Sequence, residues 1–176
     1  MFKAPAAPLV TSQEAMLCRR RVMKEYEDLM TTKIPHVHIA KDENNHLDWY
    51  CLIHGLDDPY LDGEFIFKIQ LSPRYPLAPP DFYFLTPNGR FELNKKLCFS
   101  NSSYHGETWS PIWTIRTIVL GFLSFFLEES SKGVGHLSTT KEVKRGFATS
   151  SKAHNETHLA SVLAMIRTQN NLLITK

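Results

Sequence analysis

Alternation of apolar and polar side chains is clearest between residues 64 and 71. The apolar members of this pattern are Phe65, Phe67, Ile69 and Leu71, and the polar ones are Glu64, Lys68 and Gln70. Such a period of two is typical of a strand with one buried face. Weaker strand patterns cover residues 37–40, 47–53 and 81–85, and connections rich in Asn, Asp, Gly and Pro separate them. The pattern predicts a four-stranded antiparallel meander.

Helical periodicity precedes and follows these strands. Thr11-Ser12-Gln13-Glu14 has the form of a capping box and predicts a helix that runs to about Met30. Its predicted core face is the stripe Ala15, Cys18, Val22, Tyr26 and Leu29. Residues 114–130 are apolar on nearly every side, which predicts a helix buried on most faces. Residues 139–153 and 157–172 carry the amphipathic patterns of two further helices.

These elements predict a single α+β domain with an N-terminal helix, a four-stranded antiparallel meander and C-terminal helices. With 176 residues the chain is large enough to bury a core without disulfides or metals. We expect the domain to span residues 11–172. Residues 1–10 are rich in Pro and Ala, and we expect them to form a flexible tail.

Composition excludes several classes of function. A formal net charge of +2 argues against general affinity for nucleic acid. Cys18, Cys51 and Cys98 show no CxxC spacing, so neither a disulfide framework nor a zinc site is indicated, and we expect no metal or organic cofactor. Cys18 and Cys51 fall on apolar faces and are expected in the core. The longest apolar run, residues 118–127, is too short to span a bilayer. We therefore expect a soluble cytoplasmic chain.

Cys98 lies in a different setting, in the polar and glycine-bearing stretch from Thr86 to Trp113. Lys95 and Lys96 precede it, and nearby positive charge with partial exposure favours a thiolate. Asn88 lies upstream in a Thr-Pro-Asn-Gly turn, and its side-chain amide is a candidate donor to a developing oxyanion. The stretch predicts a nucleophile with an amide donor close by.

Four motifs follow one another along the chain. They are Pro59-Tyr60 with Gly63-Glu64-Phe65, the segment Tyr75 to Pro80, the turn Thr86-Pro87-Asn88 before Leu97-Cys98, and Trp109-Ser110-Pro111 after it. Together they resemble the motifs of ubiquitin-conjugating enzymes, which carry ubiquitin as a thioester on a cysteine. The usual turn in this family is His-Pro-Asn. Threonine in its first position, with longer spacings around the cysteine, resembles the branch that is tail-anchored in the endoplasmic reticulum. The resemblance covers residues 11–130.

The resemblance implies two acyl transfers through Cys98, first from the activating enzyme and then to a lysine or, in this branch, a Ser or Thr hydroxyl. Asn88 would donate to the oxyanion, although it is equally suited to forming the turn. Family members often place an acid soon after the cysteine, but residues 99–103 include none. His105, with Glu107, is the nearest alternative. We hypothesise that His105 assists the second transfer as a base, and an ordinary loop histidine is the alternative.

The partners implied are ubiquitin, its activating enzyme, a ligase of RING type and protein substrates. A membrane would be reached only through a C-terminal anchor that is absent from this chain, at the cytosolic face of the endoplasmic reticulum. The candidate contact residues for the activating enzyme, on the helix face opposite the core, are Arg20, Arg21 and Lys24. Those for the ligase are Leu71, Pro73, Ser110, Pro111 and Ile112. The alternative for the basic residues is a solvated helix surface.

Three other functions are alternatives for this sequence. The first is a conjugating enzyme for another ubiquitin-like modifier, which the sequence distinguishes poorly. The second is a non-catalytic ubiquitin-binding variant of the fold, against which the retained Cys98 counts. The third is papain-like hydrolysis, which needs its own signature around the cysteine, and Leu97-Cys98-Phe99 does not match it.

Overall fold

The structure, a computed structural model, describes residues 9–98, 103–128 and 132–172, with the backbone alone at 103–105. Its elements are α1 (Ser12–Thr31), β1 (Val37–Lys41), β2 (Asp48–Ile53), β3 (Phe65–Gln70), β4 (Asp81–Phe84), the 3-10 helix η1 (Ser103–Thr108), α2 (Ile115–Leu127), α3 (Lys141–His158) and α4 (Ala160–Gln169). The predicted α+β class is confirmed. Most of the predicted tail, residues 1–8, lies outside the described residues, so its flexibility stays a prediction.

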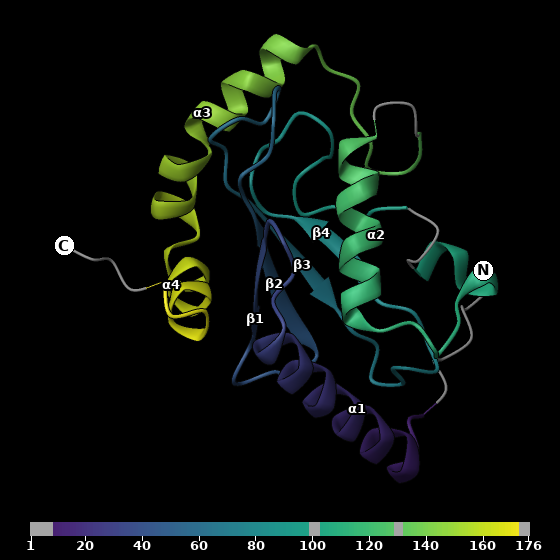
Figure 1. Cartoon of the computed structure of the whole chain (residues 1–176). Coiled ribbons are helices and arrows are strands. Elements are labelled where there is room, and N and C mark those ends of the chain that lie inside the picture. Colours follow the sequence, from purple (N-terminus) through teal and green to yellow (C-terminus); the bar gives the residue numbers. More distant parts are fainter. Residues whose placement is uncertain (1–8, 99–102, 129–131, 173–176) are drawn as a thin grey trace.

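The four strands form one antiparallel sheet in the order β1-β2-β3-β4, as the alternation predicts. Figure 1 shows this sheet with α2 on one side and α3 and α4 on the other. On the α2 side, the ring centroids of Phe67 and Phe122 lie 4.6 Å apart. On the other side, Ile66 packs in a smaller cluster that includes Leu163 and Ile166 of α4. The centre of the sheet is therefore covered by helices on both faces.

Helix α1 begins with the predicted capping box. Thr11 Oγ1 accepts from Glu14 N at 3.2 Å, and Glu14 Oε2 accepts from Thr11 N at 2.9 Å. On the predicted core face, Cys18, Val22 and Leu29 are buried and Tyr26 is half-buried. The prediction was wrong for Ala15, which lies in the first turn of the helix and is exposed.

Helix α2 is less buried than its sequence suggests. Ile118, Val119 and Phe122 lie in the core, but Leu120 is 42% exposed and Leu127 is 47% exposed. The expectation of burial on most faces was therefore wrong. The helix packs on the sheet along one side only, and an apolar residue on the opposite side has no layer to cover it.

A buried carboxylate joins α1 to the start of α2. Glu25 is 5% exposed, and its carboxylate accepts hydrogen bonds from Arg21 Nε, from Tyr75 Oη at 2.8 Å and from the backbone N of Ile115. Arg21 Nη2 also donates to Trp113 O at 3.0 Å. Burial, and then the Glu25 carboxylate, raise the pKa of Tyr75. Arg21 was expected on the solvent face, which was wrong, because its guanidinium turns inward to this cluster.

We expect Glu25→Ala to lower the free energy of unfolding by about 3–5 kcal/mol, because it leaves a partly buried guanidinium, a buried hydroxyl and a helix N-terminus without their acceptor. Denaturant unfolding measures the change. Lys24→Ala is the matched control, because Lys24 is the adjacent residue and is exposed, and we expect it to stay within about 0.5 kcal/mol of the unaltered chain. A similar loss in both variants would contradict a specific role for Glu25.

Candidate active site

Asn88 forms the core of the Thr-Pro-Asn turn. Its side chain is 1% exposed. Its Oδ1 accepts from the backbone N of Arg90 at 2.8 Å and of Phe91 at 2.9 Å, while Nδ2 donates to Thr86 O at 3.0 Å. Gly89 follows with a φ of +77°, a left-handed conformation that glycine adopts without steric cost. The turn-forming role of Asn88 is thus present in the structure, and its role as an oxyanion donor remains a proposal.

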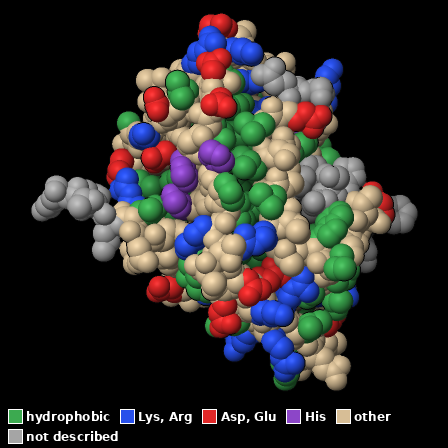
Figure 2. Space-filling model, viewed as in Figure 1, with side chains coloured by type: hydrophobic (Ala, Val, Ile, Leu, Met, Phe, Trp, Pro, Cys, Tyr) green, Lys and Arg blue, Asp and Glu red, His purple; other side chains and the backbone are tan. Residues whose placement is uncertain are grey.

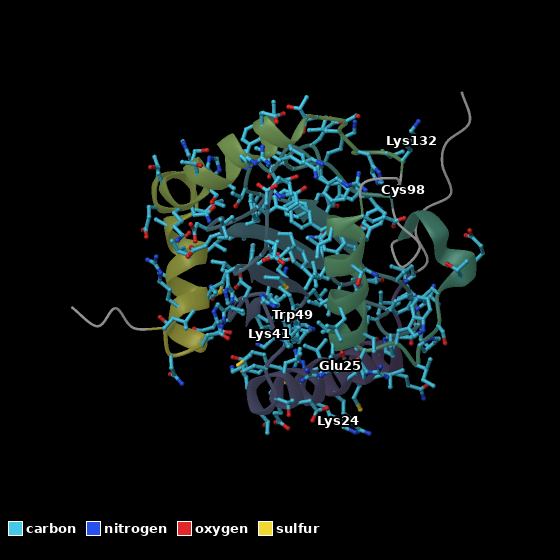
Figure 3. The ribbon with its side chains drawn as sticks, turned by 45° about the horizontal axis from the view of Figure 1, so that its top comes forward. Lys24, Glu25, Lys41, Trp49, Cys98 and Lys132 are labelled. Atoms are coloured by element: carbon cyan, nitrogen blue, oxygen red, sulfur yellow. The ribbon has the colours of Figure 1, made fainter. Side chains whose placement is uncertain are left out.

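Cys98 is half-buried and does not form a disulfide with Cys18 or Cys51. Its backbone N donates to Val134 O at 3.1 Å, and that of Glu92, on the chain leaving the turn, donates to Gly135 O at 2.8 Å. One segment, residues 133–137, therefore contacts both the cysteine and the chain that leaves the Asn88 turn. Figure 3 shows Cys98 at the end of α2 that lies away from α1 and its Lys24.

His136, a residue that the sequence reasoning missed, lies beside the cysteine. Its Nε2 is 3.1 Å from Cys98 O, and its Nδ1 is 3.4 Å from Arg90 Nη1. Because a guanidinium can only donate, Nδ1 accepts and Nε2 carries the proton that is donated to Cys98 O. Arg90 is 3% exposed, and its Nε donates to Glu128 O at 3.0 Å. The only signal in the sequence was a histidine in a glycine-bearing loop.

The two lysines before Cys98 both form ion pairs with carboxylates. Lys95 Nζ lies 2.8 Å from Glu92 Oε1, and Lys96 Nζ lies 2.9 Å from Asp81 Oδ1. Each lysine is therefore paired with a carboxylate. The expectation that Lys95 and Lys96 favour the thiolate stays a prediction.

The other two cysteines are unsuitable nucleophiles, as predicted. Cys18 is 1% exposed and Cys51 is 0% exposed. Burial raises the pKa of the Cys18 thiol and that of the Cys51 thiol, which disfavours the reactive thiolate. Exposure and local chain geometry thus single out Cys98 among the three.

The proposed base, His105, lies in η1, the short helix that follows the cysteine loop. Its backbone is described, but its side chain lies outside the described residues. Glu107 of the same helix is exposed. The role of His105 stays a prediction.

The candidate contact residues fall into two groups. Arg20 and Lys24 are exposed on α1, and Figure 2 shows Lys and Arg side chains gathered near the bottom of the view, where α1 lies in Figure 1. Pro73, Pro111 and Ile112 are exposed and Ser110 is half-buried; Ile112 reaches 79% exposure. Leu71 is 2% exposed, so its inclusion was wrong: the side chain continues the inward alternation of β3.

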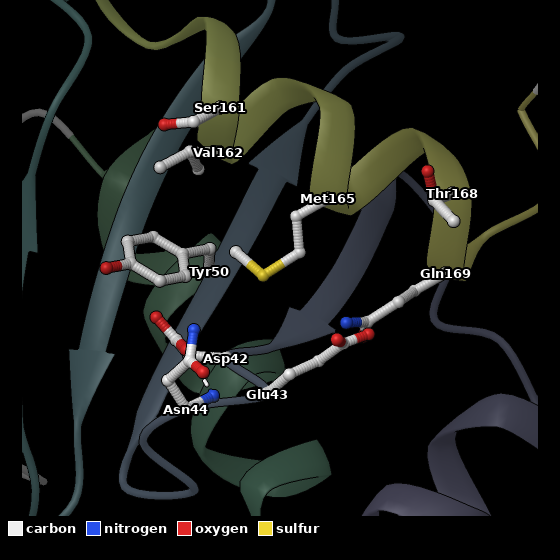
Figure 4. A pocket seen from close by; sticks show the side chains of 9 residues that line it. All are labelled: Asp42, Glu43, Asn44, Tyr50, Ser161, Val162, Met165, Thr168 and Gln169. Carbon is white, nitrogen blue, oxygen red and sulfur yellow. Dashed lines mark hydrogen bonds between the residues drawn. The ribbon is translucent and has the colours of Figure 1, made fainter.

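A pocket of about 410 Å³ lies away from Cys98, between α4 and the β1–β2 hairpin. Figure 4 shows Tyr50 and Met165 in its wall with Gln169 at one end. The Gln169 amide already bonds the backbone N and O of Lys41, at 2.9 and 2.8 Å, so it serves to fasten α4 to β1. Within the described residues, no three His, Cys, Asp or Glu side chains are grouped so that they could hold a metal ion.

Comparison with known proteins decides the family. Residues 21–146 match the family model "Ubiquitin-conjugating enzyme". The chain belongs to the ubiquitin-conjugating enzyme family. It is 40% identical over 139 residues to Ubiquitin-conjugating enzyme E2 6 of Eremothecium gossypii, a match that covers 78% of this chain and 57% of that one. It is 36% identical over 140 residues to the E2 J2-like protein of Dictyostelium discoideum, covering 79% and 82%.

A human relative, Ubiquitin-conjugating enzyme E2 J1, is 38% identical over 134 residues, covering 76% of this chain and 42% of its own. Among solved structures, a putative ubiquitin conjugating enzyme from Plasmodium yoelii matches with a TM-score of 0.57 at 21% identity, covering 80% of this chain and 94% of that one; it supports the fold. The matches span 57–58% of the length of the first curated relatives. No helix in the described ranges has the length and apolarity to cross a membrane.

Proposed function

We propose that this conjugating enzyme accepts ubiquitin as a thioester on Cys98 from the activating enzyme and transfers it to a lysine, or to a Ser or Thr hydroxyl, of protein substrates. The observation that carries the proposal is the single half-buried cysteine, held by residues 133–137 next to the chain that leaves the Asn88 turn. The retained cysteine favours this reading over a non-catalytic ubiquitin-binding variant.

In the first step the Cys98 thiolate attacks the carbonyl carbon of the activated thioester. The new Sγ–C bond forms, and the thiolate of the activating enzyme leaves. In the second step an amine or hydroxyl attacks the same carbon, the Cys98 thiolate leaves, and the nucleophile loses its proton, to His105 in our proposal. Both steps place negative charge on the carbonyl oxygen, where the Asn88 amide would donate.

The exposed residues Arg20 and Lys24 on α1 would contact the activating enzyme, where their charge would speed the encounter. The exposed Pro73, Pro111 and Ile112, with Ser110, would contact a ligase of RING type. The Thr86-Pro87-Asn88 turn resembles that of the tail-anchored branch. This resemblance supports a role in endoplasmic-reticulum-associated degradation, at the cytosolic face of that membrane.

A charging assay tests the proposal. The chain is incubated with activating enzyme, ubiquitin and ATP, and the products are compared on a gel with and without thiol reductant. We expect an adduct of one ubiquitin that reductant removes. If charging succeeded only with another ubiquitin-like modifier and its own activating enzyme, that modifier would replace ubiquitin in the proposal. Charging with neither would favour the ubiquitin-binding variant.

A further inference from the structure

The turn that carries Asn88 is fastened at its first residue to helix α3. Thr86 and Asn155 are both 0% exposed. Thr86 Oγ1 accepts from the backbone N of Ile66 at 2.9 Å and lies 2.6 Å from Asn155 Oδ1, to which it donates. Asn155 Nδ2 in turn donates to Glu64 O at 2.9 Å. The Thr86 hydroxyl has one proton. Because it accepts from the backbone N of Ile66 and donates to Asn155 Oδ1, the direction of that proton is fixed.

The same turn is fastened at its last residue by the segment that leads into α3. Thr139 Oγ1 donates to Gly89 O at 2.6 Å. A Cβ at Gly89 would lie 2.8 Å from Thr139 Oγ1 and 3.1 Å from Lys144 Cγ, so the segment also packs tightly against the turn. Two contacts, about one helix length apart in the sequence, thus hold opposite ends of a four-residue turn.

We propose that Asn155 and Thr139 are positioning residues for acyl transfer, and that they act by fixing the 86–89 turn. This inference rests on the proposed function of Cys98. The Asn88 amide must meet the developing oxyanion from a fixed direction. Its own contacts, to Thr86 O and to the backbone N of Arg90 and Phe91, set the shape of the turn and link it to the buried Phe91. The backbone N of Thr86 also donates to Ile66 O at 3.3 Å.

The threonine hydroxyl, the Asn155 amide and Thr139 add the side-chain contacts that hold the turn against the sheet and α3. Asn155 lies beyond residues 21–146, the part of the chain that matches the family model. The sequence patterns split α3 and α4 near this asparagine, but the helix continues through it to His158. Its amide bonds to the sheet and the turn, and so does not compete for the backbone of its own helix.

Single-turnover discharge tests this inference. Each chain is charged with ubiquitin, charging is stopped, and loss of the thioester is followed at increasing concentrations of free lysine. Thr86→Val keeps the shape and removes the hydroxyl, and Thr86→Ser restores it. We expect Thr86→Val, Asn155→Ala and Thr139→Val to lower the maximal discharge rate by about tenfold, since a small misplacement of a reacting group costs that much or more. The half-saturating lysine concentration should not change, and Thr86→Ser should recover the rate.

Ser151→Ala is the matched control. Ser151 lies one turn before Asn155 on α3, is 1% exposed, and its Oγ accepts from the backbone N of Glu64 at 2.9 Å. It therefore fastens α3 to the same part of the sheet without contacting the turn. We expect Ser151→Ala to lower the melting temperature but not the discharge rate.

Discharge at the unaltered rate in Thr86→Val and Thr139→Val would overturn the inference. So would slow discharge in Ser151→Ala to the same degree, because the effect would then follow lost stability. If Thr86→Val and Asn155→Ala do not fold, Thr139→Val decides alone, since its side chain is only half-buried. Absence of any thioester on the unaltered chain would reject the proposed function itself, and this inference with it.

Discussion

Cys98→Ser is expected to abolish the thiol-labile ubiquitin adduct. The hydroxyl is a far weaker nucleophile than a thiolate, and any acyl group that it accepts forms an ester, which reductant does not cleave. The variant should therefore show either no adduct or an adduct that survives reductant on the same gel. Discharge of such an ester to free lysine should be slower by about 100-fold or more, because an alkoxide leaves less readily than a thiolate.

The matched control is the double variant Cys18→Ala, Cys51→Ala, which retains Cys98 as the only cysteine. Both replaced thiols are buried, so we expect some loss of stability from the small cavities. Charging should be unchanged, because neither side chain is exposed to a ubiquitin thioester. A thiol-labile adduct on Cys98→Ser, or its loss in the double variant, would place the acyl carrier elsewhere.

The sheet and α1 could be read from the sequence because their signals are local. Alternation in β3 gives the buried face directly, and the Thr11–Glu14 capping box involves residues three apart whose contacts do not depend on the rest of the chain. Leu71 shows the limit of such patterns. Its place in the alternation predicted burial, and the structure confirms it, but the same residue was also assigned to a ligase surface that required exposure.

Other residues take their environment from distant parts of the chain. Glu25 is a charged residue on the core side of a helix, and Tyr75 and the start of α2, together with Arg21, make that position tolerable. Arg21 turns inward because Glu25 is there. Lys96 pairs with Asp81 across the connection between β4 and the cysteine loop. The Arg21–Glu25 pair is a local one, four residues apart on α1. Composition and periodicity carry no information about the contacts to Tyr75, to α2 and to Asp81, because these depend on how the folded elements meet.

The candidate site divides in the same way. Cys98 and Asn88 could be proposed from the sequence because a nucleophile and a turn-forming amide have residue types and spacings of their own. The groups that hold them, Asn155 on Thr86 and His136 on Cys98 O, come from more than 35 residues away and have no motif. Buried networks of this kind strongly constrain a site, since each unsatisfied polar group is costly. They become visible only when the elements are placed in space.

Asn88→Asp is expected to slow discharge by about 100-fold, the loss typical of one oxyanion donor. Aspartate keeps an oxygen in the place of Oδ1, so the bonds from the backbone N of Arg90 and Phe91 are retained. It removes the Nδ2 donor and sets a carboxylate 3.0 Å from Thr86 O, where the amide donated. Chemical denaturation should show a loss of about 1–3 kcal/mol from that contact, while charging still occurs.

Asn88→Ala separates the two roles of the amide, because it removes acceptor and donor together. If Asn88 acts as a donor in the reaction, both variants should discharge at similarly low rates, although Asn88→Asp keeps the contacts to the backbone N of Arg90 and Phe91 that Asn88→Ala loses. If Asn88 serves the turn alone, Asn88→Asp should discharge nearly as fast as the unaltered chain, and only Asn88→Ala should be slow. Single-turnover discharge to free lysine and to free threonine, with unfolding curves for both variants, distinguishes these results. Because Asn88 is only 1% exposed, its amide can act as a donor only if the acyl group reaches the turn. We expect the discharge rates to show that the acyl group reaches it.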